Sequence, residues 1–135
     1  MATILIADDD PLLRRMLAEA LSATGARVME AANGEEAIHI AMSSKLDIAL
    51  LDLVMPNVDG LEAIRTLRIE CPDLKIVALS GGGRNRNLDI LSLAGRMGAD
   101  ACLAKPFTPR QLMQLLATKF GIGLARPTIS QPTRT

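Results

Sequence analysis

The sequence predicts an α/β protein built on an open, doubly wound parallel sheet. Five short apolar runs of strand length alternate with longer stretches in which apolar residues recur every three or four positions. Turn or helix-capping residues bound these runs. Strands that alternate with helices form parallel sheets covered on both faces, so this order of elements predicts one sheet between two helical layers.

The expected elements begin and end at recognisable signals. Asp10–Pro11, Asn33–Glu36 and Thr108–Gln111 predict helix starts, because the first residue of each can accept hydrogen bonds from free N–H groups of a first helical turn. Gly25 and Gly121 stand where helix C-caps are expected. The predicted strands are Thr3–Ala7, Arg27–Ala31, Asp47–Leu51, Lys75–Leu79 and Ala101–Ala104.

Length and composition fit one globular domain, with 49% apolar and 22% charged residues in a chain of 135. We expect this domain at residues 1–123, followed by a flexible tail or linker at 124–135, which lacks apolar periodicity. No apolar run approaches the roughly 18 residues of a membrane span and no signal peptide is present, which predicts a cytoplasmic protein. Cys71 and Cys102 are expected to be lone buried thiols.

Charge is distributed unevenly along the chain although its net value is zero. Residues 1–62 hold 11 acids and 4 bases, whereas residues 63–135 hold 4 acids and 11 bases. An acidic region attracts cations, and a basic face suits an acidic partner surface. The absence of Trp and Tyr argues against an aromatic surface for single-stranded nucleic acid.

Chemistry-bearing residues follow four of the five predicted strands. Ligands of an open parallel sheet bind outside the carboxyl ends of its strands. The residues found there are Asp8, Asp9, Asp52, Ser80 and Lys105. Carboxylates with water and a phosphate suit Mg²⁺, a carboxylate can attack phosphorus, and a hydroxyl and an ammonium can hold phosphoryl oxygens. The pattern therefore indicates a magnesium-dependent aspartyl-phosphate site.

Each of these residues has an ordinary explanation when it is taken alone. Asp8 and Asp9 can favour the positive end of the following helix, and Asp52 can be a turn residue. Ser80 and Lys105 can be a loop serine and a solvated lysine. Their joint placement at four strand ends of one sheet edge favours the functional interpretation.

Four motifs resemble a known family. ILIADDD, LLDLVMPNVDG, ALSGG and CLAKPF, in this order and spacing, are similar to the receiver domains of two-component response regulators over about residues 3–120. The resemblance implies a flavodoxin-like fold with strand order 2-1-3-4-5. It also implies phosphorylation by the phosphohistidine of a sensor histidine kinase or a phosphotransfer protein.

The resemblance assigns roles to individual residues of the metal site. Asp52 matches the phosphoacceptor and a ligand of Mg²⁺. Asp9 matches the carboxylate that binds the metal directly, and Asp8 matches its neighbour, which often acts through water. Val54 matches the position whose backbone carbonyl is a metal ligand.

Further roles concern the phosphoryl group and the response to it. Ser80 matches a residue that contacts the phosphoryl group, and Lys105 matches the lysine that pairs with it. The Lys105–Pro106 peptide resembles one that is cis in this family. Cys102 departs from the pattern, because the family usually has Tyr or Phe at this position to report phosphorylation to the output face.

Three functions remain open on the sequence alone. The first is a phosphoacceptor that is not an enzyme and signals through a protein partner, because no helix-turn-helix for nucleic acid fits after residue 120. A homodimer through the fourth helix, fifth strand and fifth helix is a possible form of this output. The second is a pseudo-receiver that binds partners without phosphorylation. The third is a phosphatase of the haloacid-dehalogenase type, which typically has a second Asp where this chain has Val54.

Overall fold

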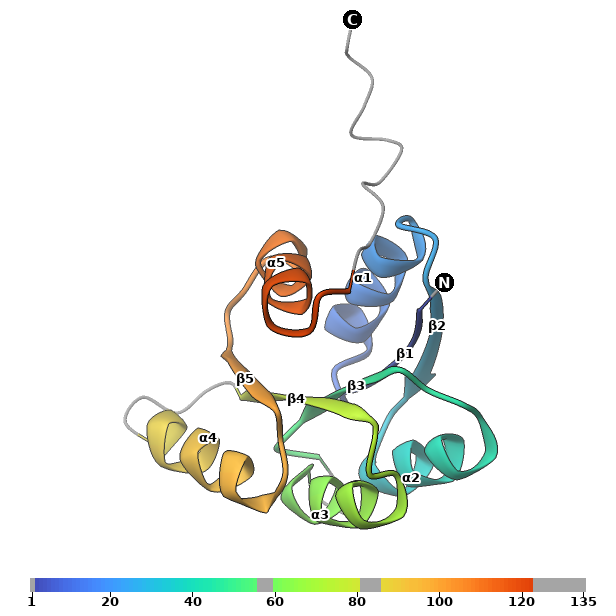
Figure 1. Cartoon of the computed structure of the whole chain (residues 1–135). Coiled ribbons are helices and arrows are strands. Elements are labelled where there is room, and N and C mark those ends of the chain that lie inside the picture. Colours follow the sequence, from blue (N-terminus) through green and yellow to red (C-terminus); the bar gives the residue numbers. More distant parts are fainter. Residues whose placement is uncertain (1, 56–59, 81–85, 123–135) are drawn as a thin grey trace, which may run out of the picture.

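The computed structural model describes residues 2–55, 60–80 and 86–122, so the predicted tail at 124–135 lies outside the described residues. Strands and helices alternate along the chain, as the sequence predicts (Figure 1). They are β1 (Thr3–Ala7), α1 (Pro11–Ser22), β2 (Arg27–Ala31), α2 (Gly34–Ser43), β3 (Ile48–Asp52), α3 (Gly60–Glu70), β4 (Lys75–Ser80), α4 (Arg86–Met97), β5 (Ala101–Ala104) and α5 (Pro109–Phe120).

All strand pairings are parallel and the strand order is β2-β1-β3-β4-β5, which confirms the predicted topology. The register pairs Ala7 with Leu51 and Asp52 with Leu79. It also pairs Ser80 with Ala104. The carboxyl ends of β1, β3, β4 and β5 therefore lie along one edge of the sheet.

Helices cover both faces of the sheet, with α1 and α5 on one side and α2, α3 and α4 on the other (Figure 1). Successive residues of β3 point to opposite faces. Ile48 and Leu50 pack into the core beneath α1 and α5, and Ala49 and Leu51 pack into the core beneath α2, α3 and α4. All four are fully buried, which is why this strand is apolar at each of its first four positions rather than at alternate positions.

All three predicted helix starts are capped by the predicted residue, but one of them does not form a full capping box. The Asp10 side chain accepts hydrogen bonds from the backbone N–H groups of Leu12 and Leu13. Thr108 and Gln111 form both bonds of a capping box. Asn33 accepts from the N–H of Glu36, but the Glu36 carboxylate accepts from Ala32, one residue earlier than in a capping box.

The two glycine predictions have different outcomes. Gly121 caps α5 in the left-handed conformation with φ of 66°, as predicted. The Gly25 prediction is wrong, because Ala23 caps α1 in a right-handed conformation. Gly25 lies two residues further on with φ of 95°, in the turn that leads into β2. Its backbone freedom serves this turn rather than the end of the helix.

Two strand boundaries differ from the prediction. β3 begins at Ile48 and includes Asp52, because Asp52 still pairs with Leu79 of the neighbouring β4. β4 extends to Ser80, whose carbonyl accepts a hydrogen bond from the N–H of Lys105. β3 is shifted by one residue and β4 is one residue longer, so Asp52 and Ser80 lie within the sheet rather than after it.

The cysteines also differ from expectation. Neither Cys71 nor Cys102 forms a disulfide, but both are partly buried at the margin of the core rather than fully buried. Within the described residues, no helix combines the length and apolar character needed to cross a membrane.

Candidate functional site

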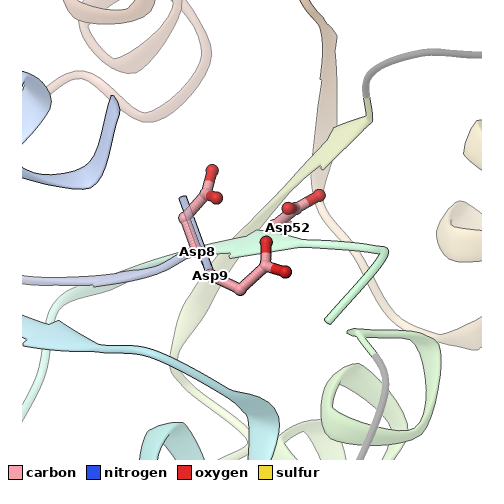
Figure 2. Close-up of side chains that lie close together, drawn as sticks. All are labelled: Asp8, Asp9 and Asp52. Carbon is pink, nitrogen blue, oxygen red and sulfur yellow. The ribbon is translucent and has the colours of Figure 1, made fainter. Parts of the chain in front are cut away.

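Three aspartates from two strand ends form the centre of the candidate site (Figure 2). Asp8 follows β1 and Asp52 is the last residue of β3, so the pairing of β1 with β3 brings them together. One carboxylate oxygen of each of Asp8, Asp9 and Asp52 lies within 4.8 Å of the others. Asp8 is fully buried and Asp52 is 4% exposed, whereas Asp9 is exposed.

Lys105 reaches this cluster from the end of β5. Its Nζ lies 2.9 Å from Oδ2 of Asp8 and 3.4 Å from Oδ2 of Asp52. Its backbone N–H donates to the carbonyl of Ser80, and the Lys105–Pro106 peptide is cis, as the resemblance implies. One ammonium therefore contacts two of the three carboxylates.

Ser80 and Val54 are the remaining predicted site residues, and they differ in exposure to solvent. Ser80 is 1% exposed at the end of β4, at the same sheet edge as the aspartates. Val54 lies two residues after Asp52, and its N–H donates to Oδ1 of Asp52 at 3.3 Å. Val54 is 63% exposed, so an apolar residue faces solvent beside the Asp52 carboxylate.

Cys102 occupies the strand position at which the resemblance predicts an aromatic ring. It lies on β5 opposite Ala78 and packs against the core beneath α2, α3 and α4. Burial raises the pKa of its thiol, which keeps the thiol neutral. This chain therefore has a small, neutral side chain where the family usually has Tyr or Phe.

Burial and neighbouring charges raise the pKa values of Asp52 and Lys105. Burial, followed by the charge of Asp8, raises the pKa of Asp52 to about 6, although Lys105 and the N–H of Val54 act in the opposite direction. Burial would lower the pKa of Lys105, but the hydrogen bond to Asp8 and the charges of Asp52 and Asp8 outweigh it and raise this pKa. The site thus carries more negative charge than Lys105 neutralises.

The donor set fits Mg²⁺. This ion prefers oxygen ligands and is usually held in proteins by one or two carboxylates, with waters and phosphate oxygens completing its octahedron. Asp8, Asp9 and Asp52 offer such oxygens at close range. Burial, followed by the charge of Asp8, raises the pKa of Asp52, and a nearby cation would act in the opposite direction. A bound cation would keep Asp52 ionised.

We expect Asp52→Asn to stabilise the metal-free protein above pH 6. The pKa of Asp52 is about 6 in the folded chain and 3.8 ordinarily, so protonation favours the folded state and ionisation opposes it. The stabilising effect of the proton is complete below pH 3.8 and is lost as the pH rises through 6. Removing the charge should therefore gain on the order of 2 kcal/mol at pH 8 and almost nothing at pH 4.

Urea unfolding in a metal chelator, followed by circular dichroism at both pH values, measures this difference. Asp73→Asn, at an exposed position, is the control and should change stability equally little at either pH. A gain at Asp52 that is the same at pH 4 and pH 8 would contradict the assignment of the effect to this carboxyl.

Gly60 is the last residue of the motif LLDLVMPNVDG and lies next to the site. Sequence reasoning gave it no role. It begins α3 and donates its N–H to the carbonyl of Leu53. A Cβ at this position would lie 2.2 Å from the backbone oxygen of Asp52 and 2.5 Å from Cα of Leu53. Only glycine lets α3 approach the end of β3 this closely.

We expect Gly60→Ala to destabilise the protein by about 3 kcal/mol or more, because the added carbon meets backbone that must move. Gly95→Ala is the matched control, since Gly95 is exposed in α4 and its Cβ would have no neighbour within 4 Å. That variant should be neutral or stabilising by about 0.5–1 kcal/mol. Equal stability of the two variants in urea unfolding would refute the close-approach argument.

Comparison with known proteins places this fold and acidic site in a defined class. The chain superposes on the CheY-like response regulator receiver domain of Methanospirillum hungatei with a TM-score of 0.80 and 27% identity, covering 88% of this chain and 93% of that one. The receiver domain of Clostridium thermocellum gives a TM-score of 0.81 with 26% identity, over 90% and 95% of the two chains.

The sequence matches the model of the response regulator receiver domain over residues 4–117. The chain therefore belongs to the receiver domain family of two-component response regulators. It is 37% identical over 116 residues to the phosphate regulon transcriptional regulatory protein PhoB of Pseudomonas aeruginosa, covering 84% of this chain and 49% of PhoB. It is 36% identical over 111 residues to the transcriptional regulatory protein ResD of Bacillus subtilis, covering 82% and 44%. The chain thus spans about half the length of these relatives.

Proposed function

We propose that this chain is a phosphorylation-dependent receiver that accepts a phosphoryl group on Asp52 from the phosphohistidine of a sensor histidine kinase or a phosphotransfer protein. The observation that carries the proposal is the placement of Asp52, a buried carboxylate that shares the ammonium of Lys105 with Asp8. Members of the family are phosphoacceptors rather than enzymes in general. Burial, followed by the charge of Asp8, raises the pKa of Asp52, and a bound cation would favour its ionised form.

The transfer needs few chemical groups. A carboxylate oxygen of Asp52 attacks phosphorus in line with the phosphorus–nitrogen bond of the donor, and the bonding electrons of that bond return to the imidazole nitrogen. Lys105, whose Nζ lies 3.4 Å from Asp52, is placed to bind an oxygen of the arriving group. Ser80, at the end of β4, is the proposed second donor to these oxygens.

Asp8, Asp9 and Asp52 would hold Mg²⁺ together with the backbone carbonyl of Val54. The ion would neutralise charge on the phosphoryl oxygens as they approach the carboxylates. Asp8 keeps its orientation without the metal, because Oδ1 accepts from the N–H of Asp10 and Oδ2 accepts from Lys105. Burial of Asp8 and Asp52 limits the water that competes for the nucleophile.

We further propose that phosphorylation is read by a protein partner or by a second copy of the chain, through the face formed by α4, β5 and α5. Arg96, Arg110 and Lys119 lie on its two helices. Such basic side chains suit an acidic partner surface. Cys102 on β5 cannot act as the aromatic reporter of the family, so the change must reach this face through backbone or core packing.

Treatment with acetyl phosphate in the presence and absence of Mg²⁺ tests the proposal. The expected result is a mass increase of one phosphoryl group in intact-mass spectra, which depends on Mg²⁺ and is reversed by hydroxylamine. A pseudo-receiver would show no mass increase under any condition. A phosphatase would instead release phosphate from a phosphomonoester over many turnovers, which would also overturn the proposal.

A further inference from the structure

The side chain of Arg14 on α1 bonds to Glu30 of β2 and to the backbone of Asp8 in the acidic cluster. Sequence reasoning gave Arg14 no role in the site. It lies in the first turn of α1, and its side chain is 18% exposed. Its Nη1 donates to the backbone carbonyl of Asp8 at 2.6 Å, and its Nε donates to the carboxylate of Glu30 at 3.1 Å. Glu30 lies on β2, whose pairing with β1 fixes where that carboxylate stands.

We propose that Arg14 is a positioning residue that fixes the peptide between Asp8 and Asp9, so that both carboxylates meet the cation in the required geometry. The inference rests on the proposed function and names a part of its metal site. Among the described residues, the Arg14 side chain bonds to the backbone carbonyl of Asp8 and to Glu30, and to none of the three carboxylates. It therefore acts on the site through the backbone of Asp8.

The backbone of Asp8 is held at both of its polar atoms. Its N–H, in the peptide before it, donates to the carbonyl of Ala31 at 3.1 Å, and its carbonyl, in the Asp8–Asp9 peptide, accepts from Arg14. Asp9 depends on this restraint most. Its side chain is exposed, and among the described residues no donor bonds to its carboxylate. Rotation of the Asp8–Asp9 peptide would therefore carry Asp9 away from Asp52.

Magnesium is sensitive to such a displacement. The ion demands nearly ideal octahedral geometry with metal–oxygen distances of about 2.0–2.1 Å. Residues that hold a metal ligand without touching the metal typically change affinity by about 10–100-fold when they are replaced. Loss of the bond from Arg14 to Asp8 is expected to fall within this range.

Charge and position predict opposite results for Arg14, which makes the inference testable. If only the positive charge of Arg14 mattered, its removal should strengthen the binding of Mg²⁺ to the acidic pocket. If the bond from Arg14 to the backbone of Asp8 matters, its removal should weaken the binding of Mg²⁺. Arg15 provides the matched control, because it is also cationic, adjacent in the sequence and paired with Glu30, but it is 64% exposed and makes no bond to Asp8.

The experiment measures the dissociation constant of Mg²⁺ by isothermal titration calorimetry for the wild type, Arg14→Met, Arg14→Gln, Arg14→Lys and Arg15→Met. Phosphorylation by acetyl phosphate is followed over a series of Mg²⁺ concentrations with the same proteins. Met keeps the aliphatic stem, Gln keeps polarity but is too short to reach the carbonyl, and Lys keeps one charged donor. Circular dichroism in a chelator confirms that each variant is folded.

We expect Arg14→Met and Arg14→Gln to bind Mg²⁺ about 10-fold more weakly or worse, Arg14→Lys to recover part of the loss, and Arg15→Met to stay within about twofold of the wild type. The Mg²⁺ concentration for half-maximal phosphorylation should rise in parallel, while the rate at saturating Mg²⁺ changes little. A higher Mg²⁺ requirement with an unchanged maximal rate distinguishes a positioning role from general structural damage. Structural damage would lower the maximal rate as well.

Two results would overturn the inference while the proposed function stands. One is unchanged or tighter Mg²⁺ binding by both Arg14→Met and Arg14→Gln. The other is failure of both variants to fold, because Arg14 would then serve the fold rather than the site. A wild type that binds no Mg²⁺ and accepts no phosphoryl group would overturn the proposed function, and the inference with it.

Discussion

Asp52→Asn is expected to abolish phosphorylation by acetyl phosphate while leaving the fold intact. The amide has the shape of the carboxyl group but is a poor nucleophile, so the new oxygen–phosphorus bond cannot form at a useful rate. It is also a weaker ligand for Mg²⁺, because it carries no charge. The other carboxylates of the pocket do not replace it, since Asp8 is bound by both Lys105 and the N–H of Asp10.

Intact-mass spectrometry over a time course measures this loss, with acetyl phosphate and Mg²⁺ in excess. Asp73→Asn removes a carboxylate at an exposed position on the opposite edge of the sheet and should be phosphorylated like the wild type. Asp52→Asn should unfold at a higher urea concentration than the wild type at pH 8, which excludes misfolding as the cause of the loss. Phosphorylation of Asp52→Asn at the rate of the wild type would show that another residue is the acceptor.

The meeting of side chains from several strands at one edge of the sheet was the most predictable feature of this molecule. Parallel strands must all present their carboxyl ends to one edge, so a residue such as Asp52 or Lys105 can be placed near others from its position after an apolar run alone. The observed distances of 2.9 Å and 3.4 Å from Lys105 to Asp8 and Asp52 confirm that these side chains meet. The capping box of Thr108 and Gln111 was also predictable, because both of its hydrogen bonds form within one helical turn.

Contacts between a side chain on one helix and residues of another strand could not be predicted from the sequence pattern. Arg14 and Arg15 are adjacent basic residues of α1, and nothing in the sequence distinguishes the one that binds the carbonyl of Asp8 from the one that faces solvent. The direction of each depends on where Glu30 stands after β2 has paired with β1. Gly60 is similar, since its need for glycine arises from the approach of α3 to the backbone of Asp52.

The environment of Val54 leads to the second large effect, a long-lived phosphorylated state. Hydrolysis of the acyl phosphate requires a water molecule in line with the bond between phosphorus and the Asp52 oxygen. Val54 is 63% exposed beside Asp52, and its side chain offers no hydrogen bond to such a water. Gly82, which follows β4 outside the described residues, has no side chain to offer either.

We therefore expect Val54→Asn to accelerate the loss of phosphate from Asp52 by about tenfold or more. An amide at this exposed position can donate to or accept from the attacking water, and each ~1.4 kcal/mol gained in the transition state is a factor of ten in rate. Gly82→Glu should act in the same direction. The decay is followed by intact-mass spectrometry in Mg²⁺ buffer after the phosphoryl donor has been removed.

Val54→Ala separates the two ways in which this position could act. Alanine shortens the side chain and opens the path of water to phosphorus, but it adds no hydrogen bond. If positioning of water governs the rate, Val54→Ala should decay nearly as slowly as the wild type and Val54→Asn much faster. Equal acceleration by both variants would show that the exposed valine protects the phosphorylated state by excluding water. A wild type that decays within seconds and is unaffected by either change would refute the role of Val54, because the attacking water would then be held by other groups of the site.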